Sequence, residues 1–471
     1  MLYLGLQLFR LYHTMLFFRK KGPVVKPRAE HCISRADIDP DALRVLYRLD
    51  TAGYKGYLVG GSVRDLLLKR TPKDFDIGTD ARPNEIRKLF RNCFLVGRRF
   101  RLAHIVFGRK TIETATFRKQ PEEQQVQDEN GLYQTDDNTF GSPEEDARRR
   151  DFTVNGLFYD ISTFNVIDYV GGLKDLDKKL IRSIGDPNVR FREDPVRMMR
   201  AVRFAAKLGF EIDSADKRAI KKHSEEITKA PIARLCEEIF RLFVDGASEE
   251  SFRRLWQFNL MKYLLPTVHD YVESTGGEKS PLWFYLATLD KAARNDAVLT
   301  NAVRLAVLFY PIFLARLKKE ESASGRPQRI NRRQIAINVL DPVSRNYRMP
   351  KVAWMGAVTL MEVMPRFGEE PSARNRHQRF VQHRIFEEAL LFVKIAVVAE
   401  AGSTAALDAW RALHDKHLRS VGKAEKAEDS GEDTAVEPSA AHPAKRRRRR
   451  KKKPVSDKVT EKQTLPDFGA V

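Results

Sequence analysis

Residues 58–77 read LVGGSVRDLLLKRTPKDFDI, and this stretch indicates the class of fold. An apolar strand over 56–59 ends at the pair Gly60 and Gly61, and the pattern predicts a helix over 62–69. Glycines at such a turn let the backbone approach a ligand closely, and the free N–H groups of a helix start can face a phosphate. Strand-to-helix turns with glycines are also common in purely structural settings, so this turn alone does not establish a nucleotide site.

Two carboxylates follow the glycine turn on a predicted strand over 74–77. Alternate residues of a strand project to one face, so Asp74 and Asp76 would lie together, with Phe75 and Ile77 on the other face. Adjacent carboxylates repel each other, and a hard divalent cation such as Mg²⁺ relieves that repulsion. Two such aspartates without a further motif nearby usually lie on a solvated strand edge. Beside the glycine turn it indicates a site where two metal ions could activate a hydroxyl and hold a leaving pyrophosphate.

Sites of this kind are expected to hold a third acid, and the sequence offers two candidates. Glu113 lies on an alternating strand over 111–117, which we expect to neighbour the acidic strand. Asp151 follows three arginines, 148–150, whose guanidinium groups could grip a triphosphate and a ribose. Either acid could instead be a structural ion-pair partner, and the arginine context favours Asp151 slightly.

A basic helix is predicted over 195–208, with Asp194 as its N-cap and proline at its first position. Arg197, Arg200 and Arg203 recur every three residues on one strip of this helix, and Arg197 lies in the first turn, where the helix dipole disfavours a cation. An Asp and Arg pair could read adenine, since the carboxylate accepts from the exocyclic amine and the guanidinium donates to a ring nitrogen. The alternative is a capping aspartate beside a solvated basic face.

The wider pattern predicts an α/β head on a helical body. Further strands are expected over 103–107 and 111–117, and strand signals nearly vanish after residue 186. Apolar positions that repeat every three and four residues then predict helices over 195–208, 232–243 and 386–398.

Composition indicates the kind of partner. The chain has 471 residues with 84 Lys and Arg against 63 Asp and Glu, and its net charge of +21 points to a polyanionic partner such as nucleic acid or nucleotide. Three widely spaced cysteines, Cys32, Cys93 and Cys236, fit a reducing compartment without structural zinc, so a cytoplasmic location is expected.

Both ends of the chain differ from the rest. Residues 1–18 are apolar but interrupted by Gln7, Arg10 and His13, which argues against a signal peptide or a membrane span. We expect a short peripheral helix or a start codon read too far upstream, and no stable membrane association. From about residue 421 the polar sequence, with nine consecutive basic residues over 445–453, predicts a disordered tail. A phosphate-binding arm is the preferred reading of that run, ahead of a nuclear address.

Taken in order, these motifs closely resemble one known family. They are similar to the branch of the nucleotidyltransferase superfamily that contains bacterial poly(A) polymerases and tRNA CCA-adding enzymes, over roughly residues 40–245. The resemblance implies an α+β fold, in which a palm-like head with a mixed β-sheet is followed by an all-α neck and body. It also implies Mg²⁺ dependence, with two ions, and untemplated addition of nucleotides to an RNA 3′ hydroxyl.

Carried over by position, the resemblance assigns Asp74 and Asp76 to the metal ions and Asp151 to completion of the active site. Eight further residues are expected to contact the triphosphate, the ribose or the base: Gly60, Gly61, Arg64, Arg150, Asp194, Arg197, Arg200 and Arg203. The implied domains are an N-terminal extension (1–35), the head (36–180), a neck with the base-reading motif (181–250), an RNA-binding body (251–420) and a disordered basic tail (421–471). ATP and RNA 3′ ends are the implied partners, with the RNA-decay machinery as a further candidate.

Two stretches separate the branches of this family. Residues 95–105, LVGRRFRLAHI, and 231–238, PIARLCEE, resemble poly(A) polymerases more than CCA-adding enzymes, although Cys236 stands where an aromatic residue is expected. The leading hypothesis is therefore AMP addition from ATP with release of pyrophosphate. A CCA-adding enzyme is the alternative within the class, and an RNA-binding protein that has lost catalysis is the alternative outside it.

Overall fold

The computed structural model describes residues 22–97, 101–119, 139–323, 330–372 and 375–429. Contacts divide the chain into one compact unit that ends at Asp415 and a second that starts at Lys416, and the first contains every element discussed below up to α19. The predictions for residues 1–18 and for the basic run over 445–453 lie outside the described residues.

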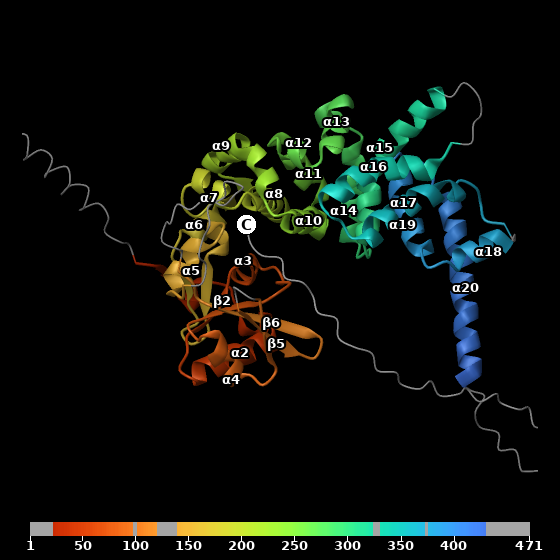
Figure 1. Cartoon of the computed structure of the whole chain (residues 1–471). Helices are drawn as coiled ribbons and strands as arrows, with labels where there is room; N and C mark the ends of the chain where they lie inside the picture. The colour runs from red at the N-terminus through yellow and green to blue at the C-terminus, as the bar shows by residue number, and fades with distance from the viewer. Residues whose placement is uncertain (1–21, 98–100, 120–138, 324–329, 373–374, 430–471) are drawn as a thin grey trace, which may run out of the picture. The chain divides into compact units, whose positions relative to one another are not determined.

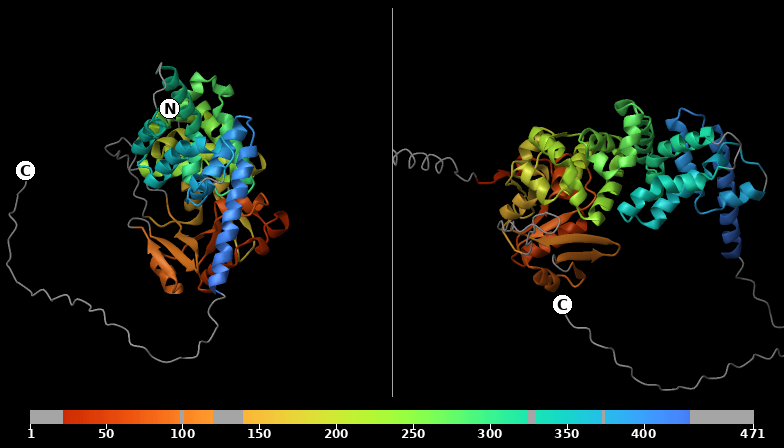
Figure 2. Two further views of the ribbon diagram at one scale, coloured as in Figure 1. Left: turned by 90° about the vertical axis from the view of Figure 1, so that its right-hand side faces the viewer. Right: turned by 45° about the horizontal axis from the view of Figure 1, so that its top comes forward.

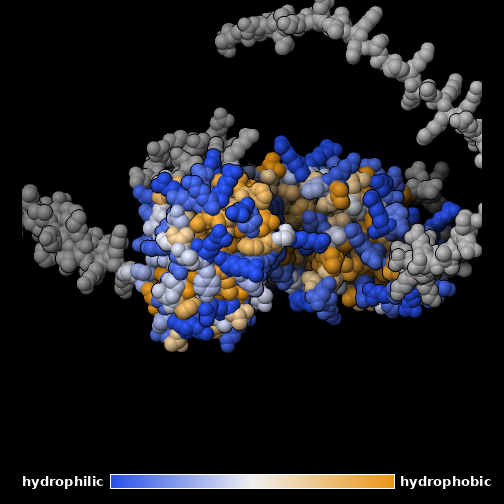
Figure 3. Space-filling view, turned by 90° about the horizontal axis from the view of Figure 1, so that it is seen from below, coloured by the Kyte–Doolittle hydropathy of each residue, from blue (hydrophilic) through white to orange (hydrophobic). Residues whose placement is uncertain are grey.

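No helix of the described part is long and apolar enough to cross a membrane. Hydrophilic side chains cover most of the face in Figure 3, with hydrophobic patches between them.

The head is built on a mixed eight-stranded sheet with the order β1-β8-β7-β2-β3-β6-β5-β4 (Figure 1). Its neighbours pair antiparallel except β3 and β6, which run parallel, so the predicted mixed sheet is confirmed. The strands are β1 (Val24–Lys26), β2 (Gly56–Val59), β3 (Asp76–Thr79), β4 (Cys93–Val96), β5 (Leu102–Phe107), β6 (Lys110–Thr116), β7 (Leu157–Asp160) and β8 (Val166–Asp168). Strand β1 belongs to the segment expected to be an N-terminal extension, yet it pairs with β8 as part of the head sheet.

The longest helix of the head begins at a capping aspartate. In α2 (Pro40–Thr51), the Asp39 side chain accepts from the N–H groups of Asp41 and Ala42, and the proline occupies the first turn. Its residues Val45, Leu46 and Leu49 are fully buried in the core. The other helices of the head are α3 (Gly61–Leu67), α4 (Pro83–Leu89), α5 (Pro143–Arg149) and α6 (Gly172–Asp177).

The acidic strand begins two residues later than predicted. Asp76, not Asp74, opens β3, because its partner β2 ends at Val59 and the first register pair is Val59 with Asp76. Beyond Val59 the chain turns at Gly60, whose φ of 74° lies in the left-handed region. Asp74 therefore lies on the loop that enters β3 instead of within the strand.

Helices make up nearly all of the described residues after the head, as Figure 2 shows from two further directions. Among the described residues beyond 186, the one strand is β10 (Glu211–Ile212), which pairs with β9 (Leu180–Ile181). The predicted helices over 195–208, 232–243 and 386–398 are α8 (Val196–Leu208), α10 (Ile232–Arg241) and α19 (Phe386–Ala399). The remaining helices up to α18 are α7 (Pro187–Glu193), α9 (Ser214–His223), α11 (Ser248–Gln257), α12 (Leu260–Leu264), α13 (Pro266–Ser274), α14 (Leu282–Arg294), α15 (Asn301–Ala323), α16 (Arg332–Asn346), α17 (Lys351–Val363) and α18 (Asn375–Val381).

The last helix corrects the predicted start of the tail. Helix α20 (Ala405–Asp429) continues past residue 421, where the sequence led us to expect an unfolded linker. Residues 421–429 read VGKAEKAED, and their alanines, lysines and glutamates are strong helix formers, so local propensity extends the helix.

A buried aspartate organises the segment that follows β8. Asp168 is 3% exposed, and its carboxylate accepts from four consecutive backbone N–H groups, those of residues 170–173, at 2.9–3.0 Å. This loop leads into α6, where Asp175 accepts from the Thr153 hydroxyl at 2.8 Å. A Cβ on Gly172 would lie 2.2 Å from the Thr153 carbonyl oxygen, so only glycine fits this approach. The loop thus fixes the backbone at Thr153, two residues after Asp151.

Replacing Asp168 by alanine is expected to lower the free energy of unfolding by about 3 kcal/mol, because four buried or partly buried N–H groups lose a charged acceptor. Urea denaturation followed by circular dichroism measures the change. Asp177→Ala, at an exposed position of α6, is the matched control and should shift stability by no more than about 0.5 kcal/mol. Equal effects of the two variants would contradict this role of Asp168.

Candidate active site

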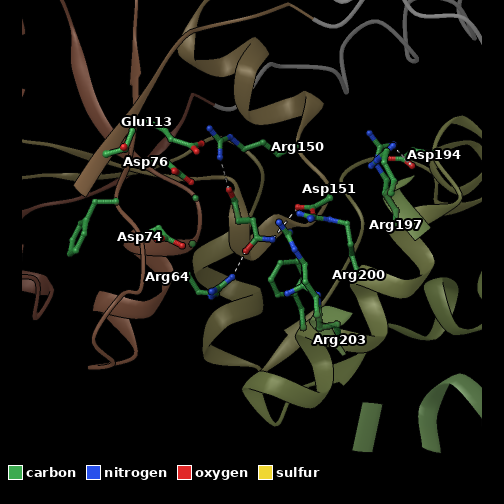
Figure 4. Close-up of a pocket in the computed structure, with 18 residues that line it drawn as sticks. Arg64, Asp74, Asp76, Glu113, Arg150, Asp151, Asp194, Arg197, Arg200 and Arg203 are labelled. Atoms are coloured by element: carbon green, nitrogen blue, oxygen red, sulfur yellow. Dashed lines mark hydrogen bonds and ion pairs between the residues drawn. The ribbon is translucent and has the colours of Figure 1, made fainter. Parts of the chain in front are cut away.

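A cleft with a volume of about 660 Å³ lies between the head sheet and the neck helices α8 and α10. Its size is in the range of small-molecule sites. All eleven site residues predicted from the sequence line it, together with Phe75, Thr111, Glu113, Asn155, Phe204, Arg234 and Arg241. Carboxylates from the head occupy one side, and arginines from the neck occupy the other (Figure 4).

The acidic side holds three exposed carboxylates, Asp74, Asp76 and Glu113. Strands β3 and β6 pair with Ile77 beside Thr114, which places Asp76 beside Glu113 on the same face. The pKa of Asp76 is raised to about 6, because the cleft reduces its hydration and because Glu113 and Asp74 repel its negative charge. Within the described residues, no three His, Cys, Asp or Glu side chains are clustered closely enough to form a ready metal cage. The acidic side is nevertheless a place where a cation would relieve repulsion between hard oxygen ligands.

Asp151, the favoured third acid, already has partners for both of its oxygens. Oδ1 accepts from the Asn155 amide at 3.0 Å and from the Phe152 N–H at 2.8 Å, and Oδ2 accepts from Arg200 Nε at 2.9 Å. Burial alone would raise the pKa of Asp151, but Arg200 and these hydrogen bonds hold it well below the usual range. The geometry therefore favours Glu113 over Asp151 as the third carboxylate beside Asp74 and Asp76.

A buried glutamate, Glu238, organises the basic side. It is 5% exposed on α10, and its Oε2 accepts from Arg203 at 2.9 Å, while its Oε1 lies 3.6 Å from Arg200 and 3.4 Å from Arg241. One carboxylate thus offsets the charge of three guanidinium groups that line the cleft. The sequence analysis missed both Glu238 and Arg241. Glu238 could have been found, because it is a charged residue at a position of α10 where the apolar repeat predicts a buried side chain.

The glycine turn lies beside Arg150 and Arg64. The left-handed backbone at Gly60 favours glycine, and a Cβ there would lie 2.8 Å from Arg150 Nη1 and would displace this guanidinium group. Arg150 pairs with Asp146 at 2.9 Å and remains partly exposed to the cleft. Arg64 is only 3% exposed, and it donates to Asp65 and to Asn155. Its position indicates that it supports the floor of the cleft through these two partners.

The predicted base-reading pair lies at the neck end of the cleft. Helix α8 begins at Val196, one residue later than predicted, and the Asp194 carboxylate still accepts from the Val196 N–H at 3.3 Å, as a capping residue does. Arg234 of α10 donates to both oxygens of Asp194 at 2.9 and 2.8 Å, a contact that the sequence analysis did not predict. Arg197 pairs with Glu193 at 3.0 Å and lies 3.9 Å from Asp194.

Comparisons with known proteins agree with this architecture. Residues 56–182 match the family described as the Poly A polymerase head domain, and residues 209–272 match the probable RNA and SrmB-binding site of polymerase A. The chain is 45% identical to poly(A) polymerase I of Salmonella typhimurium over 334 residues, which cover 69% of this chain and 71% of the relative. It is 38% identical to the CCA-adding enzyme of Lactobacillus helveticus, over 46% of this chain and 53% of that enzyme.

Solved structures show the same fold. The CCA-adding enzyme of Bacillus stearothermophilus in complex with CTP superposes with a TM-score of 0.58 at 26% identity, over 81% of this chain and 83% of that one. The mixed sheet, the acidic strand and the basic neck define a nucleotidyltransferase. The chain belongs to the family of poly(A) polymerases and tRNA nucleotidyltransferases, and the resemblance inferred from its motifs is confirmed.

Arg200→Met is expected to lower the free energy of unfolding by about 3 kcal/mol at pH 7, because Asp151 would remain largely buried without its cation. Urea denaturation measures this loss. Arg218→Met, at an exposed position of α9, should change stability by no more than about 0.5 kcal/mol. Adding Asp151→Asn to Arg200→Met should restore part of the loss, and strictly additive effects would show that the pair is not coupled.

Proposed function

We propose that this protein is a poly(A) polymerase, which transfers AMP from ATP to the 3′ hydroxyl of RNA without a template and releases pyrophosphate. The observation that carries the proposal is the 45% identity to poly(A) polymerase I across more than two thirds of both chains. Asp74, Asp76 and Glu113 line the same cleft as the neck arginines, and a protein that only binds RNA would not need carboxylates there.

Asp74 and Asp76 would hold a divalent ion, with Glu113 as the third carboxylate beside them. The donor set fits Mg²⁺, because it consists of hard oxygen ligands, and loss of hydration together with repulsion from Glu113 and Asp74 raises the pKa of Asp76. When bound, such ions supply positive charge that lowers the pKa of the attacking hydroxyl and offsets the charge on the leaving pyrophosphate. Two ions would suit both tasks, as in other two-metal sites.

The basic side would hold the triphosphate. Arg150 reaches the cleft beside the glycine turn, where the backbone of Gly60 and Gly61 leaves room for phosphate oxygens. Arg200 and Arg203 face the same space from α8 and are held there by Asp151 and Glu238. Asp151 would therefore contribute to catalysis by keeping Arg200 oriented, since its own oxygens are engaged.

Asp194 and Arg197 would read the base. A carboxylate acceptor selects an exocyclic amine, and adenine and cytosine carry one next to a ring nitrogen acceptor, whereas guanine and uracil present a carbonyl group there. Arg234 uses only part of the acceptor capacity of Asp194 and would orient its plane. The pair alone accepts either A or C, so the shape of the surrounding pocket must decide between ATP and CTP.

The remaining partners follow from charge and from the family. The net charge of +21 and the matched RNA-binding segment over 209–272 support RNA as the polymer substrate. Contact with the RNA-decay machinery and a cytoplasmic location stay predictions.

Asp74→Ala is expected to reduce AMP incorporation by at least about a hundredfold, because the metal loses a ligand, while RNA binding persists. Extension of a labelled RNA in Mg²⁺ and ATP measures activity, and fluorescence anisotropy measures binding. Asp80→Ala changes an exposed aspartate just past the end of β3, outside the cleft, and should retain activity. Wild-type activity of Asp74→Ala would overturn the assignment of the metal site.

Substrate choice separates the two activities of the family. The protein is expected to extend both an unstructured RNA and a tRNA without its CCA end when ATP alone is supplied, and to use CTP poorly. Gel analysis of products with ATP, CTP or both nucleotides tests this. Addition that stops at CCA on the tRNA alone would instead identify a CCA-adding enzyme, and no extension of either RNA would indicate that catalysis has been lost.

A further inference from the structure

One row of side chains crosses four strands of the head sheet and ends at the acidic side of the cleft. Phe94 of β4 pairs with His104 of β5, and His104 pairs with Glu113 of β6. Glu113 lies beside Asp76 of β3 in the parallel register. Residues directly opposite each other on paired strands project to the same face, so these four side chains share one face of the sheet.

The outer half of this row is an open aromatic surface. Phe94 is 63% exposed and Val96, two residues further along the same face of β4, is 47% exposed. The His104 side chain is 30% exposed, and its Nε2 lies 3.8 Å from Glu113 Oε1. On the opposite face of the same strands, Cys93, Ala103 and Ile105 are buried in the core. The core therefore requires apolar side chains on that face, but it does not require the phenylalanine at position 94. We call Phe94 and His104 the sheet platform.

The geometry of the reaction decides which substrate can reach this platform. Attacking and leaving oxygens lie roughly in line in phosphoryl transfer, so the hydroxyl and the pyrophosphate lie on opposite sides of the α-phosphorus. Of the arginines that would hold the triphosphate, Arg200 and Arg203 come from α8 on the neck side of the cleft, as Figure 4 shows, whereas Arg150 comes from the head beside the glycine turn. We therefore expect the hydroxyl to approach from the side of Glu113, where β6 is followed in the sheet by β5 and β4.

We propose that the sheet platform binds the last nucleotides of the RNA 3′ end by stacking their bases on Phe94 and His104. The proposal rests on the RNA-extending function proposed above and identifies the subsite of its polymer substrate. Stacking on aromatic rings suits this substrate because every base has a π face, so the ring accepts any RNA sequence. The platform is continuous with the cleft through Glu113, which favours the RNA over a protein partner as its occupant.

The test compares two exposed aromatic residues of the head. Phe94→Ala is expected to weaken binding of a short fluorescent RNA and to raise its KM by between about 5-fold and 150-fold, the range for loss of one stacked base. The KM for ATP should stay unchanged. Tyr47→Ala, at an aromatic residue on α2 of the head that is 39% exposed and does not line the cleft, is the control and should leave both values unchanged.

Two further comparisons separate stacking from simple apolar contact. Phe94→Trp should bind the RNA at least as well as the wild type, whereas Phe94→Leu should resemble Phe94→Ala. An RNA with abasic residues at its last three positions should bind the wild type and Phe94→Ala equally. Equal binding of an intact RNA to wild type, Phe94→Ala and Phe94→Leu would overturn the proposal and leave a protein partner as the occupant of this face.

Failure of the platform and failure of the proposed function give different results. Anisotropy of the RNA without ATP needs no catalysis, so it tests the platform even if the protein extends no RNA. If the wild type extends RNA but Phe94→Ala binds it normally, only the platform is wrong. If Phe94→Ala loses RNA affinity while the wild type and the control variant keep it, and none of the three extends RNA, then the proposed function is wrong and the RNA-binding site is supported.

Discussion

The ion pair between Asp151 and Arg200 is the contact on which the rest of the site depends. It joins the segment after α5 of the head to α8 of the neck, and Asn155 and Glu238 extend it in both directions. A largely buried carboxylate without its cation would be costly, so the two elements that carry the site must stay together. The head acids and the neck arginines thereby face one cleft, although they come from separate parts of the chain.

Negative and positive side chains of the cleft come from different secondary-structure elements. Strands β3 and β6 contribute acids, whereas α8 and α10 contribute arginines that two buried carboxylates partly neutralise. This arrangement matches a substrate that combines metal ions with a polyphosphate, because each partner meets the opposite charge. The neutralising role of Glu238 is essential here, since several unpaired arginines at close range would destabilise the neck before any nucleotide arrived.

Local patterns predicted the elements of this site better than the contacts between them. The glycine turn, the acidic pair and the arginines of α8 could be located because each belongs to one element with a clear period or motif. The partners of those residues could not, because Arg234 meets Asp194 and Glu238 meets Arg203 only after α10 packs beside α8. Asp151 shows the same limit: its sequence context predicted an acid that completes the active site, but the pairing with Arg200 of α8 is seen only in the folded structure. The start of β3 was misplaced because the end of its partner strand, rather than its own residues, determines where pairing begins.

The position of β1 has a consequence for how the protein is made. Val24 pairs with Asp168, so the edge of the head sheet joins the start of the domain to a strand that is synthesised much later. Domains generally fold as units during synthesis, and pairings between distant segments form slowly. Strands β2, β3 and β6 can assemble while β8 is still inside the ribosome, but β1 must wait without a partner until β8 emerges. When β1 pairs with β8, the residues that carry the acids of the cleft and Asp151 have therefore already left the ribosome.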